Sequence, residues 1–312
     1  MNGSIISEFI LLGFSCSRTF QLTLLTWVLA CYATVLLGNF LIMVTVRAER
    51  HLLRSPMYFF LSNLSFIDMS LGSVAGPKMI ANLVICGHAI SYGGCMAQLF
   101  FLHFFGGAEM LLLTVMAYDR YVAICHPLRY MAIMDRQRCF KLLMVCWAGG
   151  LLHSTIQMVV VAQLPFCGPN MLDNFYCDIP QVIRLACTET SIIDLLMVAN
   201  SSLLSLPCFL ILLISYAVIL ATLKGRFRKG GGKALSTCSS HLIVVSLIYV
   251  PCIFVYLKPF SSSWVDKIAS MFYTVVTPAL NPIVYTLRNQ EVIDAMGKLR
   301  NRCILFPLRV KG

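Results

Sequence analysis

The chain has 312 residues, of which 59% are hydrophobic and only 12% are charged. Because soluble domains usually carry about 25% charged residues, this composition excludes an ordinary soluble domain and indicates a membrane protein. The net charge is +11, but the basic residues flank apolar runs, so no basic soluble surface is available for a nucleic-acid partner.

The first 22 residues precede the first long apolar run and are predicted to form an extracellular tail. The stretch MNGSIISEFILLGF has no basic residue ahead of its apolar part, and Glu8 lies inside that part. A cleaved signal peptide has a basic start and an uninterrupted apolar stretch. The tail is therefore expected to stay on the protein.

Seven apolar runs follow the tail, each long enough for the roughly 20 residues that a spanning helix needs. The predicted spans are 23–46, 57–80, 96–121, 141–161, 195–223, 236–258 and 268–287. Buried helices of soluble proteins rarely run this long without charge. The sequence predicts an all-α membrane protein, a seven-transmembrane helix bundle, as one domain over 1–312.

The last segment, 288–312, is predicted to be a cytoplasmic tail. Its residues Val292, Met296 and Leu299 recur at helical spacing, with basic residues opposite them. This pattern is typical of a short amphipathic helix that lies on the membrane surface.

The basic residues set the orientation. With the N-terminus outside, nineteen of the twenty-four lysines and arginines fall in inner segments. Cytoplasmic loops carry an excess of these residues, and the inner leaflet is anionic. We therefore expect a multi-pass protein of the plasma membrane with an extracellular N-terminus.

The cysteines divide between the two sides of the membrane. Six fall on the outside, where disulfides persist: Cys16, Cys86, Cys95, Cys167, Cys177 and Cys187. Six cysteines allow fifteen pairings, and the residues alone do not choose among them. Most of the other eight are interpreted as small packing residues.

Four polar residues fall within the spans at similar depth: Asn39, Asp68, Glu109 and Asn281. Ionisable groups inside a membrane are costly and usually functional. Two carboxylates that lie close together cannot both stay ionised without a cation or a shared proton. We interpret Asp68 and Glu109 as a switch network that holds sodium or a proton; the alternative is a cluster that only fixes helix packing.

Asp119 and Arg120 end the third apolar run at the inner face of the membrane. One interpretation is a snorkelling anchor, in which the long side chain reaches the interface. The other is a charge pair that breaks to admit an intracellular partner.

Several motifs, in order along the chain, resemble those of the olfactory receptor family, which are rhodopsin-like (class A) G-protein-coupled receptors. They are GN at 38–39, PMYFFLSNLSFID at 56–68, MAYDRYVAICHPLRY at 116–130, SY at 215–216, KALSTCSSHL at 233–242 and PALNPIVYTLRN at 278–289. The resemblance reaches from the first span to the end of the seventh.

The resemblance implies an activation switch at the inner face. Its members would be Asp119, Arg120, Tyr121, Tyr216, Tyr249, Asn281, Pro282 and Tyr285. In this interpretation Asp119 locks the inactive state, and Tyr216 swings towards Arg120 on activation. Asp68 and Glu109 match the acidic pair of the family.

The resemblance also implies two bridges, Cys95–Cys177 between span three and the second outer loop and Cys167–Cys187 within that loop. A sequon at Asn2 is near the usual glycosylation site.

A ligand pocket is expected in the outer half of the bundle. On span three, Leu102, Gly106 and Met110 share one face at spacing i, i+4 and i+8. Depth and family analogy complete the set of candidates: Leu102, His103, Gly106, Gly107, Met110, Asn200, Ser201, Leu204, Cys252, Tyr256 and Tyr273. The adjacent glycines either leave room for a ligand or allow close helix packing. His103 is either a core histidine or a ligand contact.

Span three carries no carboxylate where an amine ligand would need a counter-ion, which argues against a biogenic-amine receptor. A mostly apolar pocket with few polar groups suits small, uncharged volatile molecules. No catalytic, cofactor or phosphate-binding pattern is present, so we expect a receptor without enzymatic activity, cofactor or resident metal.

The sequence thus favours an odorant receptor that binds a small-molecule odorant and activates the stimulatory olfactory heterotrimeric G protein to raise cyclic AMP. The alternatives are a seven-span transporter or proton carrier that uses Asp68 and Glu109, and a metabolite receptor of the same fold outside the nose.

Overall fold

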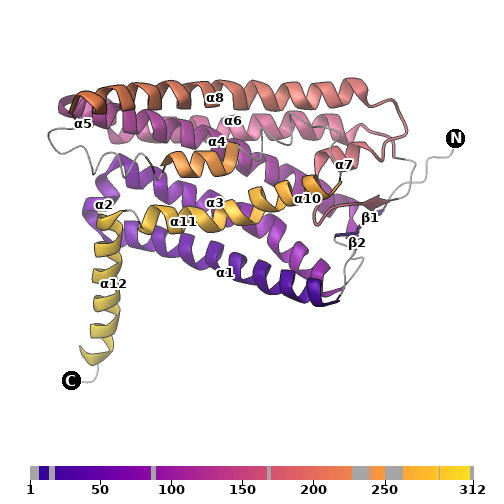
Figure 1. The fold of residues 1–312 in the computed structure, drawn as a ribbon, viewed down its shortest axis with the longest axis horizontal. Helices are drawn as coiled ribbons and strands as arrows, with labels where there is room; N and C mark the ends of the chain where they lie inside the picture. Colours follow the sequence, from indigo (N-terminus) through magenta and orange to yellow (C-terminus); the bar gives the residue numbers. More distant parts are fainter. Residues whose placement is uncertain are drawn as a thin grey trace.

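The computed structural model describes residues 7–13, 18–85, 89–166, 170–226, 239, 241–249, 263–287 and 289–309. Long helices run side by side along the molecule, with the small strands at one end and α12 at the other (Figure 1). The long helices are α1 (Arg18–Ala48), α3 (Pro56–Val84), α4 (Tyr92–Cys125), α6 (Arg136–Ala162), α8 (Ser191–Arg226) and α12 (Gln290–Arg309). Short helices fill the connections: α2 (Arg50–Arg54), η1 (Pro127–Arg129), α5 (Tyr130–Ile133) and α7 (Ile179–Ile183).

The last helix before α12 is built in three parts. These are α10 (Ser263–Met271), the π-helical turn η3 (Phe272–Val276) and α11 (Thr277–Leu287). Residues 241–249 are helical too, and the rest of the predicted span 236–258 lies outside the described residues, except for helical Ser239.

Five of the described helical stretches are long and apolar enough to cross a membrane. They are α1, α4, α6, the Ser191–Thr222 part of α8, and the continuous stretch Lys267–Thr286. Helix α3 is 29 residues long and lies between α1 and α4 in the same bundle. Helices α1, α3, α4, α6 and α8 each extend past the apolar run predicted within them, because the flanking residues continue the same backbone hydrogen bonding.

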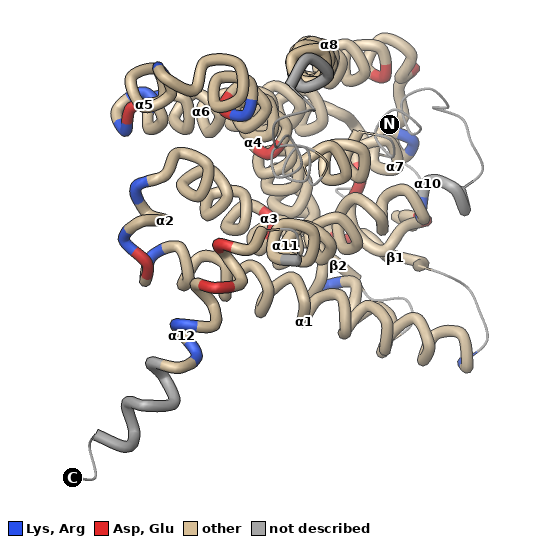
Figure 2. Tube along the Cα trace, turned by 60° about the vertical axis from the view of Figure 1, so that its left-hand side comes forward, with Lys and Arg blue, Asp and Glu red and all other residues tan. Residues whose placement is uncertain are grey.

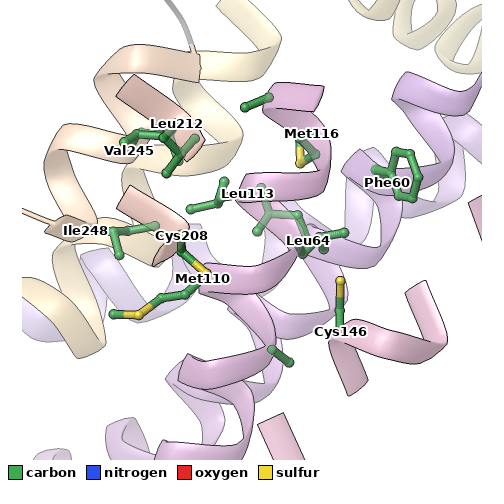
Figure 3. Close-up of a cluster of buried hydrophobic side chains, with 14 of the residues drawn as sticks. Phe60, Leu64, Met110, Leu113, Met116, Cys146, Cys208, Leu212, Val245 and Ile248 are labelled. Atoms are coloured by element: carbon green, nitrogen blue, oxygen red, sulfur yellow. The ribbon is translucent and has the colours of Figure 1, made fainter. Parts of the chain in front are cut away.

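The core lies around α4, which packs against α3, α6 and α8. Large apolar side chains from these helices and from residues 241–249 meet there in one cluster (Figure 3). Leu64, Leu113 and Ile248 in this cluster are fully buried. Because α4 is surrounded on several sides, its residues are well placed to link one end of the bundle to the other.

A small sheet covers the end opposite α12. Strand β1 (Glu8–Leu11) lies between β2 (Ala89–Ser91), to which it is antiparallel, and β3 (Met171–Leu172), to which it is parallel. Phe9 and Leu11 are fully buried beneath it. The N-terminal segment, expected only as a tail, thus forms part of the cover over this end of the bundle.

The predicted C-terminal helix is confirmed as α12, which turns away from the bundle axis (Figure 1). Val292 and Ala295 are buried against Ile42 and Val46 of α1. The hydroxyl of Tyr58 on α3 donates to Glu291 Oε2 at 2.9 Å, which fixes the start of α12 on the bundle. Lysines and arginines gather at this end, around α2, α5 and α12 (Figure 2).

Candidate functional site

A cavity of about 140 Å³ lies beneath the small sheet, between α4, α6, α8 and the α10–η3 segment. Its lining residues are Leu102, His103, Gly106, Gly107, Met110, His153, Tyr176, Asp178, Ser201, Leu204, Ser205, Ala269, Ser270, Tyr273 and Thr274. Nine of the fifteen carry a polar side-chain group, although most of the lining surface is apolar.

Eight of the eleven predicted pocket residues line this cavity. Asn200 is not among the lining residues; its amide lies 3.2 Å from Nδ1 of His153, which does line the cavity. Cys252 and Tyr256 lie outside the described residues.

The sequence reasoning missed seven lining residues. Three of them, Ser205, Ala269 and Ser270, lie three or four residues from predicted candidates, and that signal was available; Thr274 directly follows the candidate Tyr273. Tyr176 and Asp178 flank Cys177, and the expected Cys95–Cys177 bridge holds these neighbours against span three. His153 had no such signal, because an isolated histidine on an apolar helix does not reveal which face it occupies.

The paired glycines of α4 serve close packing as well as the cavity. A Cβ at Gly107 would lie 3.2 Å from the backbone of Gly150 on α6 and 3.3 Å from His153. A Cβ at Gly106 would collide with the hydroxyl of Tyr273. Both interpretations of this pair therefore hold at once: the glycines line the cavity and let neighbouring elements approach α4.

The cover of the cavity is held by covalent and ionic links. The predicted Cys95–Cys177 disulfide is present, and the Cys177 backbone N–H donates to Gln98 Oε1 at 2.9 Å. The Lys267 ammonium donates to Gly13 O at 2.8 Å and pairs with Asp173 at 2.5 Å. These contacts tie the N-terminal segment and the second outer loop to α4 and α10.

The second predicted bridge is only partly within the described residues. Cys187 is disulfide-bonded, and its predicted partner Cys167 lies outside them. The neighbours of the two cysteines, Phe166 and Ala186, are paired by an antiparallel bridge. Asn2, the predicted glycosylation site, also lies outside the described residues.

The middle of the bundle holds the predicted polar residues. Asp68 and Glu109 are each 1% exposed, and their carboxyl groups lie close enough to interact electrostatically. Asn281 Nδ2 donates to both carboxyl oxygens of Asp68 at 3.0 Å. Asn39 Nδ2 donates to the carbonyl oxygens of Val35 and Pro278 at 2.9 and 3.1 Å, so its role is to join α1 to α11.

The two buried carboxyl groups have few donors. Neither oxygen of Glu109 has a hydrogen-bond donor among the described residues. Two carboxylates in this position would repel each other strongly in a low-dielectric interior. The arrangement suits one shared proton or one small cation between Asp68 and Glu109.

The inner end of α4 carries the predicted charge pair. Asp119 is 1% exposed and forms an ion pair with the guanidinium of Arg120. The Tyr130 hydroxyl donates to Asp119 Oδ1 at 2.7 Å. The pKa of Tyr130 is raised, mainly by burial and then by the charge of Asp119, so this phenol stays protonated and able to donate. Tyr130 therefore joins α5 to the ion pair.

The other predicted switch residues divide into separate contacts. The Tyr216 hydroxyl lies 2.5 Å from Nδ1 of His241, and the Tyr249 ring lies 5.3 Å from that of Phe209. Tyr121 faces His126, with 3.4 Å between its hydroxyl and Nε2.

On α11, the Tyr285 hydroxyl is buried without a hydrogen-bond partner within the described part of the chain. Pro282 lies against Gly38 of α1, where an added Cβ would come within 3.0 Å of its ring. Gly38 therefore lets α1 and α11 approach each other.

The described part of the chain contains no group of three or more His, Cys, Asp or Glu residues able to hold a metal ion. The polar features are instead arranged along one helix. Helix α4 contributes His103 to the cavity, Glu109 to the carboxyl pair and Arg120 to the inner ion pair.

Comparisons with known proteins agree with this geometry. A family model described as olfactory receptor matches residues 28–302. Human olfactory receptor 4Q3 is 58% identical over 303 residues, covering 97% of both chains. Human olfactory receptor 4K14 is 53% identical and covers 98% of both, and mouse olfactory receptor 4E2 is 50% identical and covers 97% of this chain and 98% of its own. Squid rhodopsin shares the fold, with a TM-score of 0.74 at 16% identity over 91% of this chain and 82% of that chain.

Proposed function

The chain belongs to the olfactory receptor family, and on that premise we propose that it senses odorants in the cavity above Glu109 and signals through the stimulatory olfactory G protein. The chain is an odorant receptor with the seven-helix fold of rhodopsin. Beyond family membership, the proposal assigns the ligand pocket to this cavity, the activation switch to the inner ion pair, and the partner to the stimulatory olfactory G protein.

One observation carries the proposal: α4 bears both the cavity and the inner ion pair. His103 and Arg120 are seventeen residues apart on a single helix, which corresponds to about 25 Å along its axis. A ligand that shifts α4 relative to α6 or α8 therefore acts on Arg120 directly, without an intervening loop.

The activation step follows from the contacts at the inner end. In the closed arrangement Arg120 pairs with Asp119, and Tyr216 bonds His241. Activation breaks both contacts: Arg120 leaves Asp119, the helix that carries His241 moves outwards, and Tyr216 turns towards Arg120. A ligand drives this change only by binding the open state more tightly than the closed one.

Asp68 and Glu109 lie between the cavity and the ion pair. We assign Asp68 and Glu109 a shared proton or sodium ion that stabilises the closed arrangement. Asn281 on α11 donates to the Asp68 carboxylate, so α11 is bonded to this pair. A movement of α11 then changes the carboxyl pair and the packing around Arg120 together.

The location follows from the charge distribution. The basic end around α2, α5 and α12 (Figure 2) faces the cytoplasm, and the small sheet faces outwards. We assign the receptor to the plasma membrane as one domain with an extracellular N-terminus, a Cys167–Cys187 bridge and a glycan at Asn2.

The test is cyclic AMP in cells that express the receptor with the stimulatory olfactory G protein, against a broad panel of volatiles. A ligand-dependent rise that disappears in Arg120→Ala at matched surface expression supports the proposal. A rise that persists in that variant contradicts the switch. Neither a proton carrier nor a transporter is favoured by the family membership, and either would predict flux of its substrate without a G protein.

A further inference from the structure

Four polar side chains of the cavity, those of His103, His153, Ser201 and Thr274, are bonded to partners that determine what these groups leave for a ligand. His103 Nδ1 lies 2.8 Å from the backbone oxygen of Leu99. A carbonyl oxygen only accepts, so Nδ1 carries the proton, and in the neutral ring Nε2 is left with a lone pair. Since Nδ1 turns back onto its own helix, Nε2 points away from α4 as an acceptor on the cavity wall.

His153 has both ring nitrogens occupied. Its Nδ1 lies 3.2 Å from the Asn200 amide nitrogen, and that nitrogen also lies 3.3 Å from the His153 backbone oxygen. The carbonyl fixes the Asn200 nitrogen as the donor, so Nδ1 accepts. A neutral imidazole then has its proton on Nε2, which must meet an acceptor.

In the structure the Gln157 amide nitrogen lies 3.3 Å from that Nε2 and donates to the Ser201 hydroxyl at 3.0 Å, so two nitrogens that both carry protons face each other. A half-turn about the last side-chain bond exchanges the oxygen and nitrogen of a glutamine amide. With its oxygen turned to His153, that one oxygen can accept from His153 Nε2 and from the Ser201 hydroxyl. The proton of Ser201 is then used, and only its lone pairs face the cavity.

Thr274, on the opposite wall, also uses its hydroxyl proton in a bond within the protein. Its hydroxyl donates to the backbone oxygen of Ser270 at 2.8 Å, so its lone pairs are what remains. Three groups on three elements, α4, α8 and η3, therefore offer acceptors, while the rotatable hydroxyls of Ser205 and Ser270 adapt to either role.

We propose that the cavity selects compact, uncharged hydroxyl compounds, alcohols and phenols, whose proton is donated to Nε2 of His103. The inference rests on the proposed function, because it names the ligand class of the same cavity. The volume of about 140 Å³ fits this class, since an apolar cavity of about 150 Å³ holds a molecule of the size of benzene.

An ether or ketone of the same size fills the cavity without supplying a proton. It leaves Nε2 of His103 dehydrated and unpaired, and an unsatisfied buried acceptor weakens binding by roughly 5- to 150-fold. The hydroxyl compound donates to Nε2 and still accepts from Ser205 or Ser270, so it satisfies both walls.

The experiment measures cyclic AMP dose responses for matched sets on one skeleton. One set is 4-methylphenol, 4-methylanisole and toluene; the other is cyclohexanol, methoxycyclohexane, cyclohexanone and cyclohexylamine. Hydroxyl compounds at least about tenfold more potent than their ether and ketone partners support the proposal. Equal or greater potency of the ethers or ketones overturns it but leaves the receptor function intact, and preference for the amine overturns the assignment to uncharged ligands. Silence towards a broad volatile panel at proven surface expression overturns the proposed function and this inference with it.

The role of His103 is tested by substitution with the same ligands. His103→Phe keeps a ring of similar size without the acceptor, and it should reduce the hydroxyl-to-ether potency ratio to about one while the ether response remains. His103→Gln offers a side-chain oxygen near the place of Nε2 and should restore part of the ratio. His51→Phe, at an exposed histidine on α2, is the matched control and should keep the ratio unchanged. An unchanged ratio in His103→Phe contradicts the assignment.

Discussion

Neutralising Asp119 gives the sharpest test of the inner switch. Asp119→Asn keeps the shape of the side chain but removes the charge that holds Arg120, and Asp119 is almost fully buried. Hydrogen bonds to charged groups are worth about 1.5–3 kcal/mol, and Arg120 keeps some solvent contact, so we take a value around the lower limit of that range, about 1–2 kcal/mol. The ratio of open to closed receptor should then rise about 5- to 30-fold.

The assay is ligand-free cyclic AMP at matched surface level. If about 1% of the wild-type receptor is open, a value within the usual range for a minor state, the variant should be about 5–25% open. Asp135→Asn is the matched control, because it is the same change on the same end of the bundle. Asp135 forms an exposed pair with Arg138 and caps α6, and asparagine caps a helix equally well, so basal signalling should stay at the wild-type level. Wild-type basal signalling in Asp119→Asn would refute the reasoning.

Three further predictions follow from named contacts. Tyr130→Phe removes the donor to Asp119 and should raise basal cyclic AMP by roughly 2- to 10-fold; no rise at matched surface level would show that Tyr130 does not stabilise the ion pair. Cys95→Ser removes a disulfide, and losing a native disulfide typically costs about 2–5 kcal/mol of stability, so the variant should show no surface staining. Normal staining would show that the Cys95–Cys177 bridge is not needed for surface delivery. Gly107→Ala forces a Cβ towards the backbone of α6 and should lower the free energy of unfolding by about 1–3 kcal/mol, which lowers the melting temperature. Gly297→Ala, where the added Cβ meets nothing within 4 Å, should not lower it, and equal melting temperatures for the two variants would contradict the packing account.

The helices of the bundle were predictable because each needs a long charge-free run, and such runs are the strongest signal that a sequence carries. The small outer sheet was not. Strand β1 has only four residues, and its partners lie about 80 and 161 residues further along the chain. A pairing between such distant short segments leaves no periodic pattern in any one of them.

In the candidate site too, features that lie along one helix were predictable, and several contacts between helices were not. The α4 face with Leu102, Gly106 and Met110 follows from helical spacing alone, whereas His153 depends on how α6 is rotated against α4. The carboxyl pair was expected from depth along two helices, and Asn281 joins it because α11 packs against α3. Asn39 was expected at the same place but bonds Pro278, since similar depth does not specify direction around a helix axis.

The central claim is that occupation of the outer cavity opens the inner face to a G protein. Purified receptor in lipid nanodiscs, mixed with purified stimulatory olfactory G protein, tests it most directly through the rate of guanine-nucleotide exchange. A hydroxyl odorant active in cells should accelerate exchange by wild-type receptor, and the acceleration should be lost in Arg120→Ala. Exchange that is unaffected by the odorant, or equally accelerated in Arg120→Ala, would contradict the account.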